Sequence, residues 1–287
     1  MSPADYDYLC RFLKECSGLV LAAEKEYLVE NRLTPVARRN ACASVGELIQ
    51  RVKANASDPL RIEVVEAMMN NESFFFRDRI PFERMRDTIL PDLLIKRAAR
   101  KQIRIWCAAC STGQEPYSLA MLLDDHPGIA GWQIDILATD ISNDALEQAK
   151  SGLYSQFEVQ RGLPIQMLMR HFEQIDDQWQ IGERLRKRVQ FRQSNLLSDF
   201  AALGMFDVVF CRNVLIYFDH ATKLDVLARV RRSIAADGYL VLGAAETMVG
   251  LGTEFIPVPE KRAIYQPSAR PPAPPVVKAV RSGVRVA

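Results

Sequence analysis

The spacing of apolar residues divides the chain into two parts, and the first part is predicted to be helical. Up to about residue 100, apolar residues recur with the three-to-four-residue period of amphipathic helices. Ser44 and Glu47 form an S-x-x-E capping box, and Pro59 stands at a first helical position. We therefore predict a small all-α domain over residues 1–78, followed by a linking helix.

After Lys101 the pattern changes to short β-rich runs separated by helical stretches. The runs are QIRIW, QIDILATD, VQFRQSN, FDVVFC and YLVLG. Strands that alternate with helices predict a mostly parallel, doubly wound α/β sheet, which we assign to residues 79–266. A segment at about 153–190 interrupts the alternation and is treated as an inserted β-subdomain, with a small antiparallel hairpin predicted in WQIGERLRKRV. The runs EFIPV and RAIYQ predict a second hairpin, which closes the sheet edge.

The charge of the chain is unevenly distributed. The net charge is +2, and residues 267–287 contribute four of the basic residues and no acid, so residues 1–266 carry −2. This last stretch is proline-rich, and we predict that it is disordered. A slightly negative folded part is not typical of a polyanion binder, which argues against a nucleic-acid partner.

Neither a membrane segment nor a disulfide framework is predicted. No run approaches the roughly 18 consecutive apolar residues of a membrane helix, and the start MSPADYDYLC lacks the features of a signal peptide. We therefore expect a cytoplasmic protein without membrane insertion, in which the six scattered cysteines are reduced. Cys107 and Cys110 have CxxC spacing, but the chain has no second CxxC and only three histidines, so no metal is predicted.

The stretch IRIWCAACSTGQEPYSLAMLL, residues 103–123, reads as a strand, a turn of small residues and a helix. Nucleotide-binding folds carry a glycine-rich loop here, but this turn has one glycine, Gly113, and a carboxylate, Glu115, which would repel a phosphate. A cationic ligand without phosphate, such as S-adenosylmethionine, fits better. Asp140 ends the second strand, where an acid can hold both ribose hydroxyls, although capping the next helix is an alternative for it.

Two further stretches carry candidate functional residues. MNNESFFFRDR has three successive phenylalanines followed by Arg77, and FCRNVLIYF ends a buried strand and leads to Tyr217. Neither a helix nor a strand can bury three successive side chains on one face. We expect Phe74 and Phe75 to be core residues, and we assign functional roles to Arg77 and Tyr217.

Taken in order, these motifs resemble the chemotaxis receptor methyltransferases, the CheR family. The resemblance runs from about residue 5 to residue 266 and rests on NNESFFFRD, WCAACSTGQEPYSLAM, ATDIS, SNLL and CRNVLIYFD. It implies a Rossmann-like methyltransferase domain with a small inserted antiparallel β-subdomain, preceded by a helical domain that recognises receptors. It also implies S-adenosylmethionine-dependent methylation of receptor glutamates to γ-methyl esters, with S-adenosylhomocysteine as product. Ala109 stands where the family often has glycine, and Gln114 where it often has glutamate.

The resemblance also implies site residues. The expected cofactor contacts are Asn71, Ser73, Arg77, Glu115, Asp140, Asn195, Leu196, Arg212 and Asn213. Of these, Asn195 and Leu196 are expected to flank the adenine. A glutamate carboxylate, with a pKa near 4.3, is already ionised at pH 7, so the acceptor needs no general base. Catalysis is then mostly alignment, which can supply about 7–11 kcal/mol of the barrier. We expect Arg77 to orient the acceptor carboxylate and Tyr217 to fix its approach.

Receptor recognition is assigned to the helix predicted in AEKEYLVENRLTPVARRN. Val29, Leu33 and Val36 fall on one face, and basic residues fall on another. The family places substrate recognition on this helix, so the expected receptor-binding residues are Arg32, Arg38 and Arg39. Pro35 after Thr34 predicts that a new helix begins there.

The expected partner is the cytoplasmic methylation helix of a chemoreceptor, bound by a monomer. Some members of the family bind a pentapeptide at the receptor's carboxyl end through a glycine-containing loop of the β-subdomain. Here the corresponding stretch, FEQIDDQWQIGERLRKRV, is short and has one glycine, Gly182, so we predict no such tether.

Two alternative functions stay open. A base-modifying methyltransferase would show a D/N/S-P-P-Y/F stretch after its fourth strand, where this chain has CRNVLIYF, and it would carry a basic folded surface. A non-enzymatic receptor-binding or signalling module that keeps the S-adenosylmethionine pocket is the other alternative. The presence of Arg77 and Tyr217 argues against it.

Overall fold

The computed structural model describes residues 1–22 and 24–269, which divide into two units. The first unit holds residues 1–70 with the short segment 217–222, and the second holds 71–216 with 223–269. From residue 270 on, the predicted disordered tail lies outside the described residues. Within the described ranges, no helix has the length and apolar character needed to cross a membrane.

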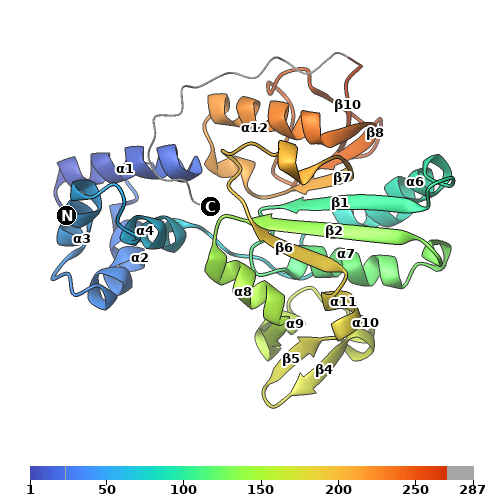
Figure 1. Cartoon of the computed structure of the whole chain (residues 1–287), viewed down its shortest axis with the longest axis horizontal. Helices are drawn as coiled ribbons and strands as arrows, with labels where there is room; N and C mark the ends of the chain where they lie inside the picture. Colours follow the sequence, from blue (N-terminus) through green and yellow to red (C-terminus); the bar gives the residue numbers. More distant parts are fainter. Residues whose placement is uncertain (23, 270–287) are drawn as a thin grey trace. The chain divides into compact units, whose positions relative to one another are not determined.

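The first unit consists of four helices and the segment 217–222 (Figure 1). The helices are α1 (Pro3–Ser17), α2 (Glu26–Arg39), α3 (Val45–Ala54) and α4 (Leu60–Met68). Helix α3 begins where the capping box predicts, because the Ser44 hydroxyl accepts the amide of Glu47 at 3.2 Å. The apolar stripes of the helices meet in a core that includes the fully buried Leu9, Leu13, Leu33 and Val64.

The prediction that a new helix begins at Pro35 is wrong. Helix α2 is continuous from Glu26 to Arg39, with Pro35 inside it and exposed. Proline removes one backbone hydrogen bond from a helix interior. The predicted apolar face offsets that loss, because Val29, Leu33 and Val36 are at most 1% exposed.

A seven-stranded sheet with the strand order β6-β2-β1-β7-β8-β10-β9 forms the centre of the second unit (Figure 1). The strands are β1 (Gln102–Ala108), β2 (Gln133–Asp140), β6 (Val189–Gln193), β7 (Phe206–Cys211), β8 (Ile234–Val241), β9 (Phe255–Pro257) and β10 (Ile264–Pro267). The first five in this order are parallel, and β10 is antiparallel to β8 and β9. The doubly wound sheet and the closing hairpin are thus confirmed. Strand order reverses between β1 and β7, which places a ligand crevice at their carboxyl ends.

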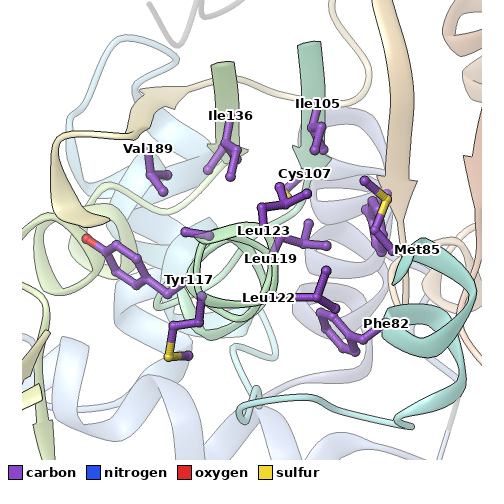
Figure 2. Packing of buried hydrophobic residues seen from close by; sticks show 14 of the residues in the cluster. Phe82, Met85, Ile105, Cys107, Tyr117, Leu119, Leu122, Leu123, Ile136 and Val189 are labelled. Atoms are coloured by element: carbon purple, nitrogen blue, oxygen red, sulfur yellow. The ribbon is translucent and has the colours of Figure 1, made fainter. Parts of the chain in front are cut away.

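Helices surround this sheet and connect its strands. They are α5 (Ile80–Arg84), the π-helical turn η1 (Met85–Ile89), α6 (Leu90–Lys96), α7 (Gln114–Asp124), α8 (Asn143–Ser151) and α12 (His220–Ser233). Short 3-10 turns are η2 (Pro127–Ile129), η3 (Ala201–Leu203) and η4 (Leu215–Tyr217). Figure 2 shows α7 end-on, with Leu119 and Leu123 directed at Ile105 of β1 and Ile136 of β2, all buried. This packing fixes the start of α7 relative to the strand ends.

The inserted segment forms a second sheet, of order β3-β5-β4. Its elements are β3 (Leu153–Ser155), α9 (Gln156–Gln160), α10 (Ile165–His171), β4 (Phe172–Ile175), β5 (Gln178–Ile181) and α11 (Glu183–Arg186). The inserted β-subdomain is confirmed, but its hairpin was predicted in the wrong place. The hairpin turns at Asp176 and Asp177, where Asp176 has a φ of 52°, as tight hairpin turns require. The residues after Gly182 form α11 instead.

Candidate functional site

Asp140 joins the two loops that follow β1 and β2. Its Oδ2 accepts the amide of Ser111 at 2.7 Å, and its Oδ1 accepts the amide of Ser142 at 3.0 Å. The side chain is 6% exposed, and burial raises its pKa while these amides oppose the rise. Ser142, rather than Asp140, caps α8 through its hydroxyl. The alternative that Asp140 caps α8 is therefore wrong, and Asp140 instead binds the amides of the two loops.

The loop after β1 has a tightly wound backbone. Ala109, Ser111 and Gly113 all have positive φ, of 61°, 52° and 93°. A Cβ at Gly113 would lie 2.9 Å from the Cβ of Ala149 and 3.0 Å from the Tyr154 hydroxyl. The loop's single glycine therefore stands where another residue would be both strained and crowded. Its conformation leaves the start of α7, with Glu115, beside the strand ends.

Arg212 is the buried centre of a charged network at the end of β7. It is 5% exposed, and its Nη1 donates to Glu115 Oε2 at 2.7 Å. Its Nη2 donates to the Arg77 carbonyl at 2.7 Å and to Asp78 Oδ2 at 3.0 Å. Burial raises the pKa of Glu115, and the Arg212 guanidinium opposes that rise. Glu115 and Arg212 are thus held as an ion pair.

The segment that contains Arg77 lies against this network. The backbone carbonyl of Asn71 accepts a hydrogen bond from the Ser111 hydroxyl at 2.7 Å. This contact joins the segment to the loop after β1. Arg77 Nη1 donates to the Glu72 carbonyl at 2.7 Å. The nearby side chain of Ser73 is half-buried. These contacts bring Asn71 and Arg77 together with Glu115, Asp140 and Arg212.

The three successive phenylalanines take different positions. Phe75 is fully buried, as predicted, but the prediction of a core position for Phe74 is wrong. Phe74 is half-buried, and the guanidinium carbon of Arg77 lies 5.5 Å from its ring centroid. Because adjacent side chains cannot share one buried face, Phe74 packs against a cation instead of the core.

Asn195 and Leu196 follow the last pairing of β6 with β2, which joins Gln193 to Asp140. The Ser194 amide donates to the Asp140 carbonyl at 2.9 Å, so this stretch begins directly beside Asp140. Leu196 is 8% exposed. The residues implied for the adenine therefore lie at the same sheet edge as the residue implied for the ribose.

Glu246 is a residue of this site that sequence reasoning missed. Its carboxylate accepts four backbone amides, from Asn213 at 2.7 Å, Gly243 at 2.8 Å, Leu215 at 2.9 Å and Val214 at 3.2 Å. It also lines an open pocket of about 500 Å³ beside the β9–β10 hairpin. Glu246 stands three residues after the run YLVLG, near the carboxyl end of a parallel strand. That position was the sequence signal that could have identified it as a site residue.

Comparisons with known proteins identify the family. A family model described as "CheR methyltransferase, SAM binding domain" matches residues 71–264, and one described as "CheR methyltransferase, all-alpha domain" matches residues 4–69. The chain belongs to the CheR methyltransferase family. Its second unit thus contains an S-adenosylmethionine-binding methyltransferase domain, and the predicted resemblance and fold class are confirmed.

Similar proteins are found in several bacteria. The chain is 42% identical over 257 residues to chemotaxis protein methyltransferase 1 of Pseudomonas aeruginosa, covering 88% of this chain and 93% of that protein. It is 40% identical over 256 residues to a chemotaxis protein methyltransferase of Pseudomonas putida, with the same coverage. The chemotaxis protein methyltransferase of Vibrio parahaemolyticus is 39% identical over 260 residues, covering 89% of this chain and 93% of that protein.

Tyr217 belongs to the first unit of this CheR-family chain. Its hydroxyl accepts a hydrogen bond from Asn70 Nδ2 at 2.7 Å, and its carbonyl accepts the amide of Val20 at 2.9 Å. Lys14 and Asp219 form an ion pair of 2.7 Å in the same unit. The expected role of Tyr217 in acceptor approach stays a prediction.

The arginines predicted to bind the receptor are used differently within α2. Arg32 Nη1 donates to two carbonyls at the end of α4, at 2.6 and 3.0 Å. Arg38 and Arg39 are both exposed, and Arg39 pairs with Glu63 at 2.6 Å. Arg32 and Arg39 therefore help to hold α2 against α4. Arg38 is the better candidate of the three for contact with a partner.

The CxxC cysteines are both buried, Cys107 at 0% and Cys110 at 1% exposed. Burial raises the pKa of each thiol well above its usual range. Neither has the low pKa that a reactive or metal-binding cysteine needs.

One cluster of potential metal ligands occurs elsewhere in the described part of the chain. Donor atoms of Asp124, Asp125 and His171 lie within 4.8 Å of one another. However, Arg184 pairs with Asp124, and Arg170 pairs with Asp125 at 2.8 Å. These carboxylates are already neutralised by guanidinium groups, so we interpret the cluster as an ion-pair network that attaches the β-subdomain to α7.

Proposed function

We propose that this protein transfers the methyl group of S-adenosylmethionine to glutamate side chains of chemoreceptors. The products are a γ-glutamyl methyl ester and S-adenosylhomocysteine. The family membership supports methyl transfer in chemotaxis, and the chemistry of the strand ends supports the cofactor and the acceptor.

The observation that best supports the proposal is a pair of carboxylates at this sheet edge. Asp140 is buried at the end of β2, and Glu115 is largely buried in the first turn of α7, which follows β1. Backbone amides stabilise Asp140, which leaves its oxygens able to accept further hydrogen bonds from ribose hydroxyls. Glu115 and Asp78 share the single guanidinium of Arg212, so these three groups leave one net negative charge near the loop. Such a site suits a cofactor with a ribose, an ammonium group and no phosphate.

The acceptor chemistry needs orientation rather than proton transfer. A glutamate oxygen attacks the methyl carbon, the carbon–sulfur bond breaks, and its electron pair goes to the sulfonium sulfur. No proton moves, because the acceptor is already a carboxylate at neutral pH. Arg77, next to the Arg212 network, is placed on the segment that would orient the acceptor through a charge-assisted hydrogen bond.

Recognition of an acidic receptor helix would use Arg38, an exposed arginine of α2. We expect Arg38→Glu to raise the KM for the receptor, with Arg11→Glu as a matched control, because Arg11 of α1 is also exposed. An unchanged KM in Arg38→Glu would contradict this role. Action as a monomer, without a metal, a pentapeptide tether or a nucleic-acid partner, stays our prediction.

The decisive experiment incubates the full chain with S-adenosylmethionine labelled in the methyl group and purified cytoplasmic receptor fragments. Base-labile label on the fragment is the expected result, since esters hydrolyse in base and methylated amines do not. We expect Arg77→Ala and Tyr217→Phe to reduce transfer more than they weaken S-adenosylhomocysteine binding. Base-stable label would refute the ester, and wild-type turnover in both variants would remove their catalytic roles.

A further inference from the structure

The segment that contains Arg77 rests on the inserted β-subdomain. The Phe75 ring packs edge-on against Tyr154 and Phe172 of the insertion, with centroids 5.0 and 5.6 Å apart. Gly162 has a φ of 86°, and a Cβ there would lie 2.1 Å from the Phe75 carbonyl oxygen. The two backbones therefore meet at a point that tolerates no side chain.

Arg161, next to this contact, reaches the same segment with its side chain. Its Nη2 pairs with Glu72 Oε1 at 2.6 Å, and its guanidinium carbon lies 4.4 Å from the Phe74 ring centroid. Arg77 lies over the same ring at 5.5 Å and donates to the Glu72 carbonyl. Glu72 and Phe74 thus contact both guanidinium groups.

We propose that Arg161 is a positioning residue for methyl transfer, which acts through Glu72 and Phe74 to fix the guanidinium of Arg77. The inference rests on the proposed function, because it gives Arg77 the task of orienting the acceptor. It assigns to the inserted β-subdomain a part in the reaction that needs no receptor tether.

The charges in this arrangement depend on one another. Two guanidinium groups near one ring repel each other, and the Glu72 carboxylate, which pairs with Arg161, reduces that repulsion. The hydrogen bond from Arg161 is the main cause that lowers the pKa of Glu72, and the charge of Arg77 adds to it. Removing Arg161 leaves the carboxylate free to rotate toward Arg77, which would draw that guanidinium away from its present position.

The effect on folding should be small and the effect on turnover larger. Glu72 and Arg161 have half-exposed side chains, and exposed ion pairs contribute little to stability. Alignment in a transfer reaction is far more sensitive to displacement, so we expect kcat to fall about tenfold in Arg161→Ala. Arg161→Lys should recover part of the loss, because an ammonium can pair with Glu72 but cannot stack as a plane on Phe74.

The kinetic test compares the full-length wild type with Arg161→Ala, Arg161→Lys and Arg170→Ala, using labelled S-adenosylmethionine and a purified receptor fragment. Arg170 is the matched control, since it forms a similar exposed ion pair in the same insertion, with Asp125 at 2.8 Å. We expect a lower kcat only in the Arg161 variants, with the dissociation constant for S-adenosylhomocysteine changed less than the kcat. Equal kcat in Arg161→Ala and Arg170→Ala would overturn the proposal.

A second measurement follows the side chain of Arg77 itself. In NMR spectra of the arginine Nε–Hε groups, we expect Arg161→Ala to increase the mobility of Arg77, and an unchanged signal would overturn the positioning role. This readout needs no turnover, so it still decides the inference if the wild type methylates no receptor fragment and the proposed function fails. If Arg161→Ala does not fold, Glu72→Gln tests the same link, because it removes the carboxylate and keeps the carbonyl that Arg77 binds.

Discussion

Replacing Glu246 should weaken both the second unit and its ligand site. Glu246→Ala removes the acceptor for four backbone amides at the ends of β7 and β8. Hydrogen bonds to a charged group contribute about 1.5–3 kcal/mol each, so a simple sum would be about 6–12 kcal/mol. Asn213 and Val214 are only half-buried, and water can reach their amides after the change. We therefore expect a loss of about 3–5 kcal/mol in the free energy of unfolding.

Glu246→Gln should fall between the wild type and Glu246→Ala. The amide side chain keeps one acceptor oxygen, which can serve two of the four N–H groups, and turns its own N–H₂ group toward the other two. Two hydrogen bonds are lost, and the glutamine N–H₂ group then faces two backbone N–H groups, which are also donors. We expect the free energy of unfolding to fall by about 2 kcal/mol. The predicted order of stability is wild type, Gln, then Ala.

Urea unfolding followed by tryptophan fluorescence measures the free energy of unfolding of each variant. The signal reports on the second unit, which contains all three tryptophans, Trp106, Trp132 and Trp179. Glu260→Gln is the control, since that exposed side chain lines the same pocket. Calorimetry with S-adenosylhomocysteine should show weaker binding by Glu246→Gln, because Asn213 loses its anchor. A Glu246→Ala variant within 1 kcal/mol of the Glu260→Gln control would refute the reasoning about the four amides.

Three other outcomes are expected. Asp140→Ala should weaken S-adenosylhomocysteine binding about 100-fold in calorimetry, since two charge-assisted hydrogen bonds to the ribose are lost, and unchanged affinity would exclude the ribose contact. Because burial raises the pKa of Glu115 and the ionised form attracts the ligand's ammonium, affinity should decline as the pH falls through that raised pKa. The Glu115→Gln variant should decline less over the same pH range, and identical profiles would contradict this assignment. Cys107→Ser with Cys110→Ala should fold and bind S-adenosylhomocysteine, whereas stoichiometric zinc in freshly purified wild type would refute an inert CxxC.

Much of the fold could be predicted because its signals are local. The alternation of β-rich runs and helices gave the parallel sheet, and Asp140 could be placed because the end of a strand marks the sheet edge. The start of α3 was readable from Ser44, whose capping contact spans three residues. The hairpin was misplaced because Gly182 is a stronger turn signal in isolation than the pair Asp176 and Asp177.

Contacts between distant residues could not be predicted in the same way. The basic pattern of α2 gives no sign that Arg32 donates to carbonyls 36 and 37 residues away, so it looked like a free cation. Likewise, Glu246 and Asn213 lie 33 residues apart in the chain, and the pairing of β7 with β8 brings them together. The position of Phe74 outside the core could not be predicted either, because its ring packs against Arg77 and against Arg161 of the insertion.

The inserted β-subdomain contacts both proposed halves of the reaction site. The Tyr154 hydroxyl donates to the Thr112 carbonyl at 2.8 Å, in the loop implied for the cofactor. Arg161 pairs with Glu72, beside the residue proposed to orient the acceptor. Methyl transfer needs the methyl donor and the carboxylate oxygen in line, so contacts from one subdomain to both segments would limit their relative movement. The fully buried Tyr154 makes this contact on the cofactor side, and Arg161 makes it on the acceptor side. On this interpretation the insertion contributes to alignment whether or not it also binds a receptor.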